Sequence, residues 1–270
     1  MSRADTRPLS GLTIAGSDSG GGAGIQADLK TFAAHGVHGL SAIAALTAQH
    51  TRGVTALHVP PVAFLRAQID ACFDDFRIGV VKLGMLANTD VITAVAAALE
   101  HHQPAHIVLD PVMVATSGAR LLAADALDAL RARLLPLATI LTPNIPEAEW
   151  LLGHPIADDE AANAAVVELL TLGARALLLK GGHLQGPAEM VDRYSDGQTR
   201  AAFAHDRLDI EGHGTGCTLA SAIAANPCLG MSLLAACEAA TDYVHGALWH
   251  ATRPARSLVV VLDHFWQSRG

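Results

Sequence analysis

One short segment combines a glycine-rich turn with a cysteine and has the composition of an anion-binding site. Residues 212–218 read Gly-His-Gly-Thr-Gly-Cys-Thr, and at Leu219 they give way to an apolar run, 219–225, that predicts a helix. The first N–H groups of a helix have no acceptor within it, and the helix dipole adds about half a positive charge at that end. The segment therefore predicts a site for a phosphate or another anion.

Cys217 lies inside this turn and belongs to no Cys-x-x-Cys pair. The field that holds an anion also stabilises a thiolate, so the sequence predicts a cysteine that is close to a phosphate and reactive near neutral pH. The alternative is a plain helix start with a buried cysteine, since one Gly-x-Gly turn is a weak motif.

A second glycine-rich loop, residues 16–24, follows an apolar run, 12–15, that predicts a buried strand. A dinucleotide-binding fingerprint is excluded because no Asp or Glu lies between Leu29 and Ile69 to hold a ribose. A P-loop is excluded because no Gly-Lys-Ser/Thr follows the glycines. What remains is a loop that lets the backbone approach a small ligand.

Apolar strands alternate with amphipathic helices along most of the chain. The predicted strands are 12–15, 37–49, 54–59, 78–83, 106–109, 138–141 and 174–179, and the predicted helices are 25–35, 62–73, 90–101, 124–134, 159–172, 219–225 and 233–250. This alternation predicts an α/β fold whose parallel sheet is covered by helices on both faces. Residues 190–194 and 198–203 flank Ser-Asp-Gly and predict an antiparallel edge hairpin.

Polar residues follow three of these strands, at the sheet edge where α/β proteins bind ligands. Gln49 carries a donor and an acceptor that suit a heterocyclic base, although a solvated loop glutamine fits equally well. Lys180, one of only three lysines, ends a strand beside two glycines and suits a phosphate contact. Asn144 and Glu147 bracket a helix start, either as a capping pair or as oxygen ligands for hydrated Mg²⁺.

The composition restricts the class of protein. The chain has 270 residues, 51% of them hydrophobic, and a formal net charge of −8, which together predict one domain over 1–270 and no nucleic-acid partner. The apolar runs are too short for a membrane span. Four cysteines without a paired spacing, and no apolar leader at the N-terminus, predict a reduced, cytoplasmic protein. The 14 histidines have no accompanying cysteine pair or carboxylate cluster, which argues against a histidine-built metal site.

Taken together, the motifs resemble the ribokinase-like superfamily and, within it, the hydroxymethylpyrimidine/phosphomethylpyrimidine kinases of thiamin biosynthesis. The resemblance spans about residues 12–225 and is most specific at residues 22–32, 84–86 and 110–114. It implies a three-layer α/β/α fold with a central, mostly parallel sheet and an antiparallel edge hairpin. It also implies a homodimer that transfers two phosphoryl groups in succession from ATP, with Mg²⁺, first to the hydroxymethyl group of the pyrimidine and then to its monophosphate.

The resemblance also implies roles for individual residues. The pyrimidine pocket would consist of Gln49, Asp28, Ala23, Gly16, Met85 and Val112. The nucleotide would contact Lys180, Asn144 and Thr215, while Glu147 and Asn144 would organise Mg²⁺. Catalysis would fall to Gly214, Thr215, Gly216 and Cys217, with Cys217 taking the proton of the alcohol.

Two other functions compete with this one. A pyridoxal or pyridoxine kinase of the same fold could share the Cys217 turn, although Gln49 and Met85 favour a pyrimidine. A catalytically weak ligand-binding relative is the other, because the chain departs from the family pattern around the nucleotide. The departures are Thr116 in place of a lysine, residues 209–212 in place of a Thr-x-Asn-Thr run, and residues 258–262 in place of a glycine-rich segment.

Overall fold

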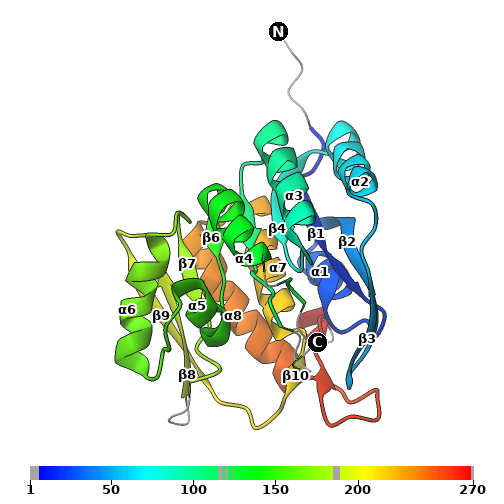
Figure 1. The fold of residues 1–270 in the computed structure, drawn as a ribbon. Coiled ribbons are helices and arrows are strands. Elements are labelled where there is room, and N and C mark those ends of the chain that lie inside the picture. The colour runs from blue at the N-terminus through cyan, green and yellow to red at the C-terminus, as the bar shows by residue number, and fades with distance from the viewer. Residues whose placement is uncertain (1–5, 115–117, 119–120, 124, 185–188, 269–270) are drawn as a thin grey trace.

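A nine-stranded sheet forms the centre of the computed structural model (Figure 1), which describes residues 6–114, 118, 121–123, 125–184 and 189–268. The strands are β1 (Ser10–Asp18), β2 (His38–His50), β3 (Gly53–His58), β4 (Ile78–Leu83), β5 (Ile107–Leu109), β6 (Ile140–Leu141), β7 (Leu177–Leu179), β8 (Glu189–Ser195) and β9 (Arg200–Asp206). Their spatial order is β3-β2-β1-β4-β5-β6-β7-β8-β9. The six strands from β2 to β7 are parallel, and the predicted hairpin β8–β9 is antiparallel.

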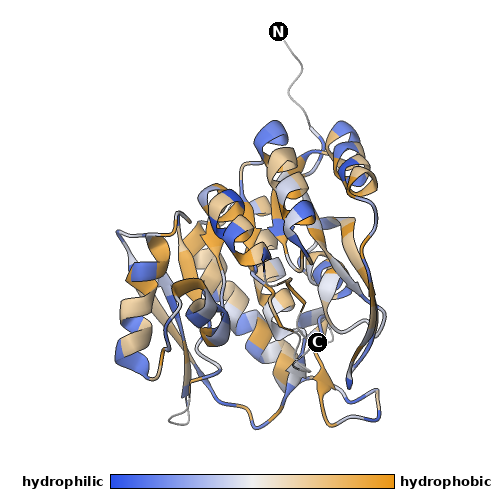
Figure 2. Cartoon of the chain, viewed as in Figure 1, coloured by the Kyte–Doolittle hydropathy of each residue, from blue (hydrophilic) through white to orange (hydrophobic). Residues whose placement is uncertain are grey.

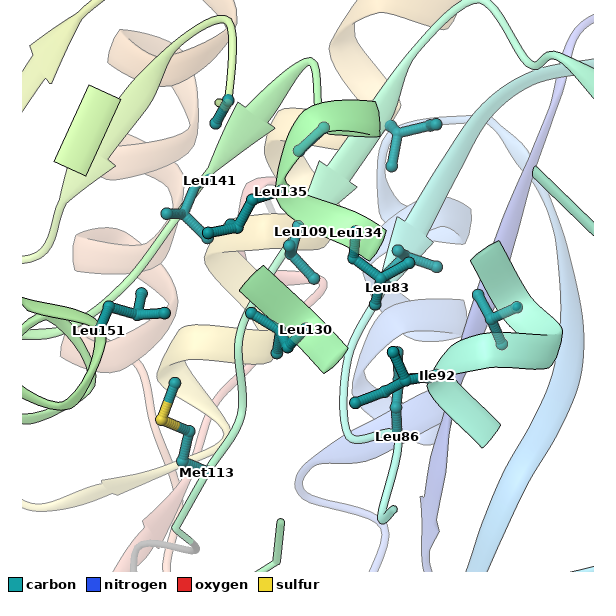
Figure 3. Packing of buried hydrophobic residues seen from close by; sticks show 14 of the residues in the cluster. Leu83, Leu86, Ile92, Leu109, Met113, Leu130, Leu134, Leu135, Leu141 and Leu151 are labelled. Carbon is teal, nitrogen blue, oxygen red and sulfur yellow. The ribbon is translucent and has the colours of Figure 1, made fainter. Parts of the chain in front are cut away.

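Helices cover both faces of this sheet, as predicted. One face carries α1 (Gly24–Ala34), α7 (Thr215–Cys228) and α8 (Leu233–Trp249), and the other carries α2 (Val62–Asp75), α3 (Thr89–His102), α4 (Ala126–Ala129), α5 (Ile145–Leu152) and α6 (Asp159–Leu170). Figure 2 shows apolar residues concentrated along the strands and polar residues on the outer helices. Figure 3 shows the leucine-rich layer between the sheet and α3 to α5, which holds the strand ends in place beneath the loops that follow them.

Three details of the sequence prediction are wrong. β3 is antiparallel to β2, because only Thr51 and Arg52 connect them and a parallel crossover needs a dozen or more residues. The predicted helix 124–134 is a short α4 followed by a π-helical turn, Leu130–Leu134, and a 3₁₀ turn, Leu135–Leu137. Finally, α7 begins at Thr215 and not at Leu219, so Cys217 lies in its first turn.

The C-terminal apolar run packs against the cysteine turn. Strand β11 (Val260–Val261) pairs in parallel with β10 (Gly212–His213), the segment that leads directly into α7. Thr116, another departure from the family pattern, lies outside the described residues. Within the part of the chain that the structure describes, no helix combines the length and apolar character needed to cross a membrane.

Candidate active site

A cavity of about 620 Å³ opens where the loops after the parallel strands meet α7. It gathers nearly all the residues singled out in the sequence: Gly16, Ala23, Gln49, Met85, Val112, Asn144, Glu147, Lys180, Gly214, Thr215, Gly216 and Cys217. Charged and polar groups to which the sequence assigned no role line it as well: Asp18, Lys82, Asp110, Asp192 and His213. Residues from the two ends of the chain thus meet in one cleft.

The start of α7 has the geometry of an anion site. Gly214 precedes the helix with a φ of 84°, and the first helical hydrogen bond runs 2.9 Å from the Thr218 N–H to the Gly214 carbonyl. The N–H groups of residues 215–217 come before that bond and therefore have no acceptor within the helix. A Cβ atom on Gly216 would lie 3.1 Å from the Lys180 Nζ, so the lysine ammonium faces this open helix end.

The two glycine-rich loops pack directly on each other. A Cβ atom on Gly214 would collide with the carbonyl oxygen of Gly22, and the His213 ring lies 2.9 Å from the Asp18 carboxylate. The same carboxylate accepts hydrogen bonds from the N–H groups of Gly20, Gly22 and Ala23. Burial opposes ionisation of Asp18, but His213 and these N–H groups outweigh it and lower its pKa. Asp18 thus fastens one loop to the other.

Cys217 differs from the sequence expectation in its ionisation. Burial raises the pKa of the thiol to about 11, against the opposing effects of the Lys82 ammonium and a hydrogen bond from the Gly24 N–H. Gly24 is the first residue of α1, so the thiol lies at the N-termini of two helices. Even so, burial outweighs the helix field, and the thiolate expected near neutral pH is a minor form in this state of the protein.

Asp28 does not line the cavity, contrary to its predicted place in the pyrimidine pocket. Its carboxylate is fully buried behind the cavity wall, with its two oxygens 2.9 and 3.0 Å from the Lys82 ammonium. Lys82, which extends from β4, lines the cavity instead. Asp28 lies one helical turn inside α1, so its side chain points toward the sheet and α7. Only the scarcity of lysine marked Lys82 in the sequence.

Lys180 lies between two carboxylates at the other end of the cavity. Its Nζ is 2.9 Å from Asp110 Oδ1 and 3.8 Å from Glu147 Oε2. The Asn144–Glu147 capping box is present, with both reciprocal hydrogen bonds formed at 2.9 and 2.8 Å. Burial raises the pKa of Glu147 to about 7, although the Lys180 ammonium opposes this shift. The capping interpretation is confirmed, and a metal-binding role for these residues stays a prediction.

Gln49 and Met85 border the opposite end of the cavity. The amide oxygen of Gln49 accepts a hydrogen bond of 3.0 Å from Thr47, and its amide nitrogen lies 3.4 Å from the His213 ring. These two contacts fix the orientation of the Gln49 amide group in the cavity wall. Met85 covers Gly16 so closely that a Cβ there would lie 2.8 Å from the Met85 sulfur. Because Gly16 has no side chain, Met85 packs directly on the backbone of the loop and stays at the cavity wall.

Known proteins with similar sequences and structures share this arrangement of the chain. A family model described as phosphomethylpyrimidine kinase matches residues 18–261. The hydroxymethylpyrimidine/phosphomethylpyrimidine kinase of Rhizobium meliloti (strain 1021) is 50% identical over 244 residues, which cover 90% of this chain and 91% of the relative. That of Streptomyces coelicolor is 45% identical over 256 residues, 94% of each chain.

Solved structures of two related kinases resemble this chain. The phosphomethylpyrimidine kinase of Clostridium difficile 630 matches with a TM-score of 0.80 and 40% identity, over 89% of this chain and 99% of that one. The pyridoxal kinase of Staphylococcus aureus, in complex with AMP-PCP and pyridoxal, matches with a TM-score of 0.88 and 30% identity, over 97% and 95%. The family match covers most of the chain, from the first glycine-rich loop to β11, and this chain therefore belongs to the phosphomethylpyrimidine kinase family.

Proposed function

We propose that this protein transfers two phosphoryl groups in succession from ATP, first to the hydroxymethyl group of 4-amino-5-hydroxymethyl-2-methylpyrimidine and then to the monophosphate, in thiamin biosynthesis. One observation carries the proposal. The Cys217 thiol lines a single cavity together with Gln49 and Met85 and with the Lys180 ammonium, which faces the open N-terminus of α7. The unbroken sheet supports one catalytic unit over 1–270, and the homodimer and the cytoplasmic location remain expectations.

The pyrimidine occupies the Gln49 end of the cavity. Gln49 hydrogen-bonds the edge of the ring, Met85 and Val112 cover its faces, and Gly16 and Ala23 leave room for it. The Gln49 amide N–H₂ donates to a ring nitrogen, and its amide oxygen, which keeps a second lone pair beside the bond from Thr47, accepts from the amino group of the ring. This placement directs the hydroxymethyl group toward Cys217 and the start of α7.

The triphosphate of ATP occupies the Lys180 end, where Thr215 and Asn144 also line the wall. A resident Mg²⁺ fits the donors here in hydrated form. No group of three His, Cys, Asp or Glu side chains in the described residues forms a metal cage, and Mg²⁺ commonly keeps its waters and binds one or two carboxylates plus phosphate. Glu147 would hold it, with Asn144 bracing Glu147 through the capping box. When bound, the ion would neutralise charge on the phosphate oxygens.

Phosphoryl transfer needs positioning and charge stabilisation more than covalent chemistry. The N–H groups of residues 215–217 and the Lys180 ammonium stabilise the charge on the transferred group. As the alcohol oxygen bonds to the γ-phosphorus, its O–H bond breaks, the Cys217 sulfur gains the proton, and ADP departs with the electrons of the broken P–O bond. The second acceptor is a phosphate that is already ionised, so it needs no base.

The assay that tests this proposal offers two acceptors in parallel. Purified protein with ATP and Mg²⁺ receives hydroxymethylpyrimidine or pyridoxal, and the products are followed by mass. We expect the pyrimidine diphosphate to accumulate. Exclusive turnover of pyridoxal would replace the proposal with the pyridoxal kinase function, the alternative that the Staphylococcus aureus neighbour favours. No turnover of either would support a ligand-binding relative.

Glu147→Gln is expected to raise the Mg²⁺ concentration needed for half-maximal rate by about 10–100-fold in both transfers. Glutamine retains the capping-box hydrogen bond, so the variant removes the charge and leaves the helix start intact. Initial rates over a Mg²⁺ titration measure the effect. Glu149→Gln is the matched control, since Glu149 lies on the same helix but accepts from the Ile156 N–H outside the cavity. An unchanged Mg²⁺ dependence in Glu147→Gln would exclude Glu147 as the ligand.

A further inference from the structure

A fully buried ion pair lies at the cavity wall, with Lys82 toward the cavity and Asp28 behind it. The Lys82 and Asp28 side chains are both 0% exposed. Two hydroxyl groups also donate to the Asp28 carboxylate, Thr13 at 2.6 Å and Ser221 at 2.7 Å. Removing two charges from water costs several kcal/mol per ion, and apolar residues of similar size often replace such a pair without loss of stability. Stability alone therefore gives no reason for this pair to be charged.

The pair lies beside Cys217, along the line where α1 packs on α7. Residues four apart on a helix lie on the same face. Gly24, whose N–H donates to Cys217, is one turn before Asp28 on α1, and Ser221, which donates to Asp28, is one turn after Cys217 on α7. The Gly24–Cys217 and Ser221–Asp28 hydrogen bonds therefore connect the same faces of α1 and α7. The Asp28 carboxylate lies one helical turn along this contact from the Cys217 thiol.

We propose that the Lys82 ammonium stabilises the thiolate of Cys217 that accepts the proton of the alcohol, and that Asp28 holds this ammonium in place. Lys82 reaches the cavity from β4 and lines it together with Cys217, whereas Asp28 stays behind the wall. Lys82 is thus a positioning residue that acts through Cys217. Its role in turnover rests on the proposed function, but its effect on the thiol does not.

Four charged groups face Cys217 from the elements packed against it. Lys82 from β4 and Lys180 after β7 favour the thiolate, while Asp28 from α1 and Asp110 after β5 oppose it. Lys82 stays protonated throughout, because the charge of Asp28 outweighs burial and raises the pKa of Lys82. During transfer the O–H bond of the alcohol breaks and an S–H bond forms. The thiol then loses this proton to solvent before the next turnover, so no other reactant is required.

The opposite charges of Lys82 and Asp28 give opposite predictions for the reactivity of the thiol. Iodoacetamide alkylation of Cys217 is followed at pH 8 on the full chain without substrates, by mass spectrometry of its peptide. Lys82→Met is expected to slow alkylation about tenfold, equivalent to one pKa unit. Asp28→Asn keeps an oxygen that accepts from the ammonium but removes the opposing negative charge, so it is expected to speed alkylation by about threefold or more. Thr13→Val removes a donor to Asp28 without changing charge and should leave the rate within about twofold.

Cys72 supplies the internal standard, because it lies on α2 on the other side of the sheet. Lys82→Met and Asp28→Asn could instead both change the alkylation rate of Cys217 in the same direction and label Cys72 faster. That result would show that the pair has a structural role, and it would overturn the proposal. If Lys82→Met does not fold with Asp28 unpaired, Lys82→Met/Asp28→Asn replaces it. We expect a Cys217 rate in the double variant below that of Asp28→Asn, and equal rates would overturn the proposal.

Kinetics supply the second readout. Variants that slow alkylation should lose the first transfer in proportion and keep the second within about threefold, because only the alcohol requires a base. Equal losses in both transfers would overturn the role in turnover. An inactive wild-type protein with the predicted alkylation pattern would contradict the proposed function alone, so the two failures are distinguishable.

Discussion

Cys217→Ala is expected to lower phosphoryl transfer to the alcohol by about 10²–10⁴-fold, the usual contribution of a general base. Transfer to the monophosphate should stay within about tenfold of wild type, since that acceptor is already ionised. Single-turnover rates with each acceptor, followed by product mass, separate the two steps. Cys228→Ala is the matched control, because Cys228 ends the same helix far from the cavity and should leave both rates unchanged. Equal losses in the two steps would mean that Cys217 only shapes the anion turn.

The pH profiles of the wild type and of Cys217→Ala give an independent check on the role of Cys217 as a base. With a thiol pKa of about 11, the thiolate fraction of wild type rises about tenfold per pH unit between pH 7 and 10, and the rate of the first transfer should rise with it. The second transfer should be nearly flat, because the acceptor phosphate loses its second proton near pH 6. Cys217→Ala should abolish the slope of the first step. A slope that persists in this variant would assign the titration to another group.

Gly214→Ala is expected to reduce both transfers by at least about 10²-fold, the loss associated with one oxyanion-type donor. The new methyl group would collide with the Gly22 carbonyl oxygen and lie 3.0 Å from the Ala23 Cα, so the two glycine loops must separate. Both transfers use the N–H groups that follow Gly214, and both should fall together. Initial rates with each acceptor, at saturating ATP, measure the effect.

Gly230→Ala is a closely matched control for this variant. Gly230 has the same φ of 84°, but a Cβ there would meet nothing within 4 Å. The two variants therefore share the cost of a left-handed alanine, roughly 1–2 kcal/mol, and differ in the collision. Gly230→Ala should lower the melting temperature and retain activity. A Gly214→Ala protein with normal rates would show that contact between the loops is not needed for catalysis.

The α/β layers and most of the cavity wall could be predicted from the sequence because they depend on local signals. Apolar strands, helix periodicity and the Asn144–Glu147 capping pair each act over a few residues, and Lys180 and Gln49 follow strands whose ends must meet at one sheet edge. The direction of β3 was mistaken because the pattern of apolar residues does not carry strand direction. The two-residue connection was the signal available for it.

The electrostatics of the cavity could not be predicted, because they depend on contacts between distant segments. Asp28 was placed in the pyrimidine pocket, but its partners are Lys82, 54 residues away, and Ser221, 193 residues away. The ionisation of Cys217 was mistaken for a similar reason. A helix N-terminus can be recognised in a sequence, whereas the burial that outweighs its field depends on how α1, β4 and α7 pack together.

The contact between the two glycine loops has a consequence for how the protein acquires activity during its synthesis. Asp18 and His213 are 195 residues apart, and β11, which pairs with β10, comes later still. A nascent chain can form β1, α1 and β4 while the wall that carries Cys217 has not yet been made. Until α7 docks, the cavity is open to water on that side, and Lys82 and Asp28 lack the covering helix that buries them. A ribosome-bound fragment that ends before α7 therefore contains most of the fold and none of the base.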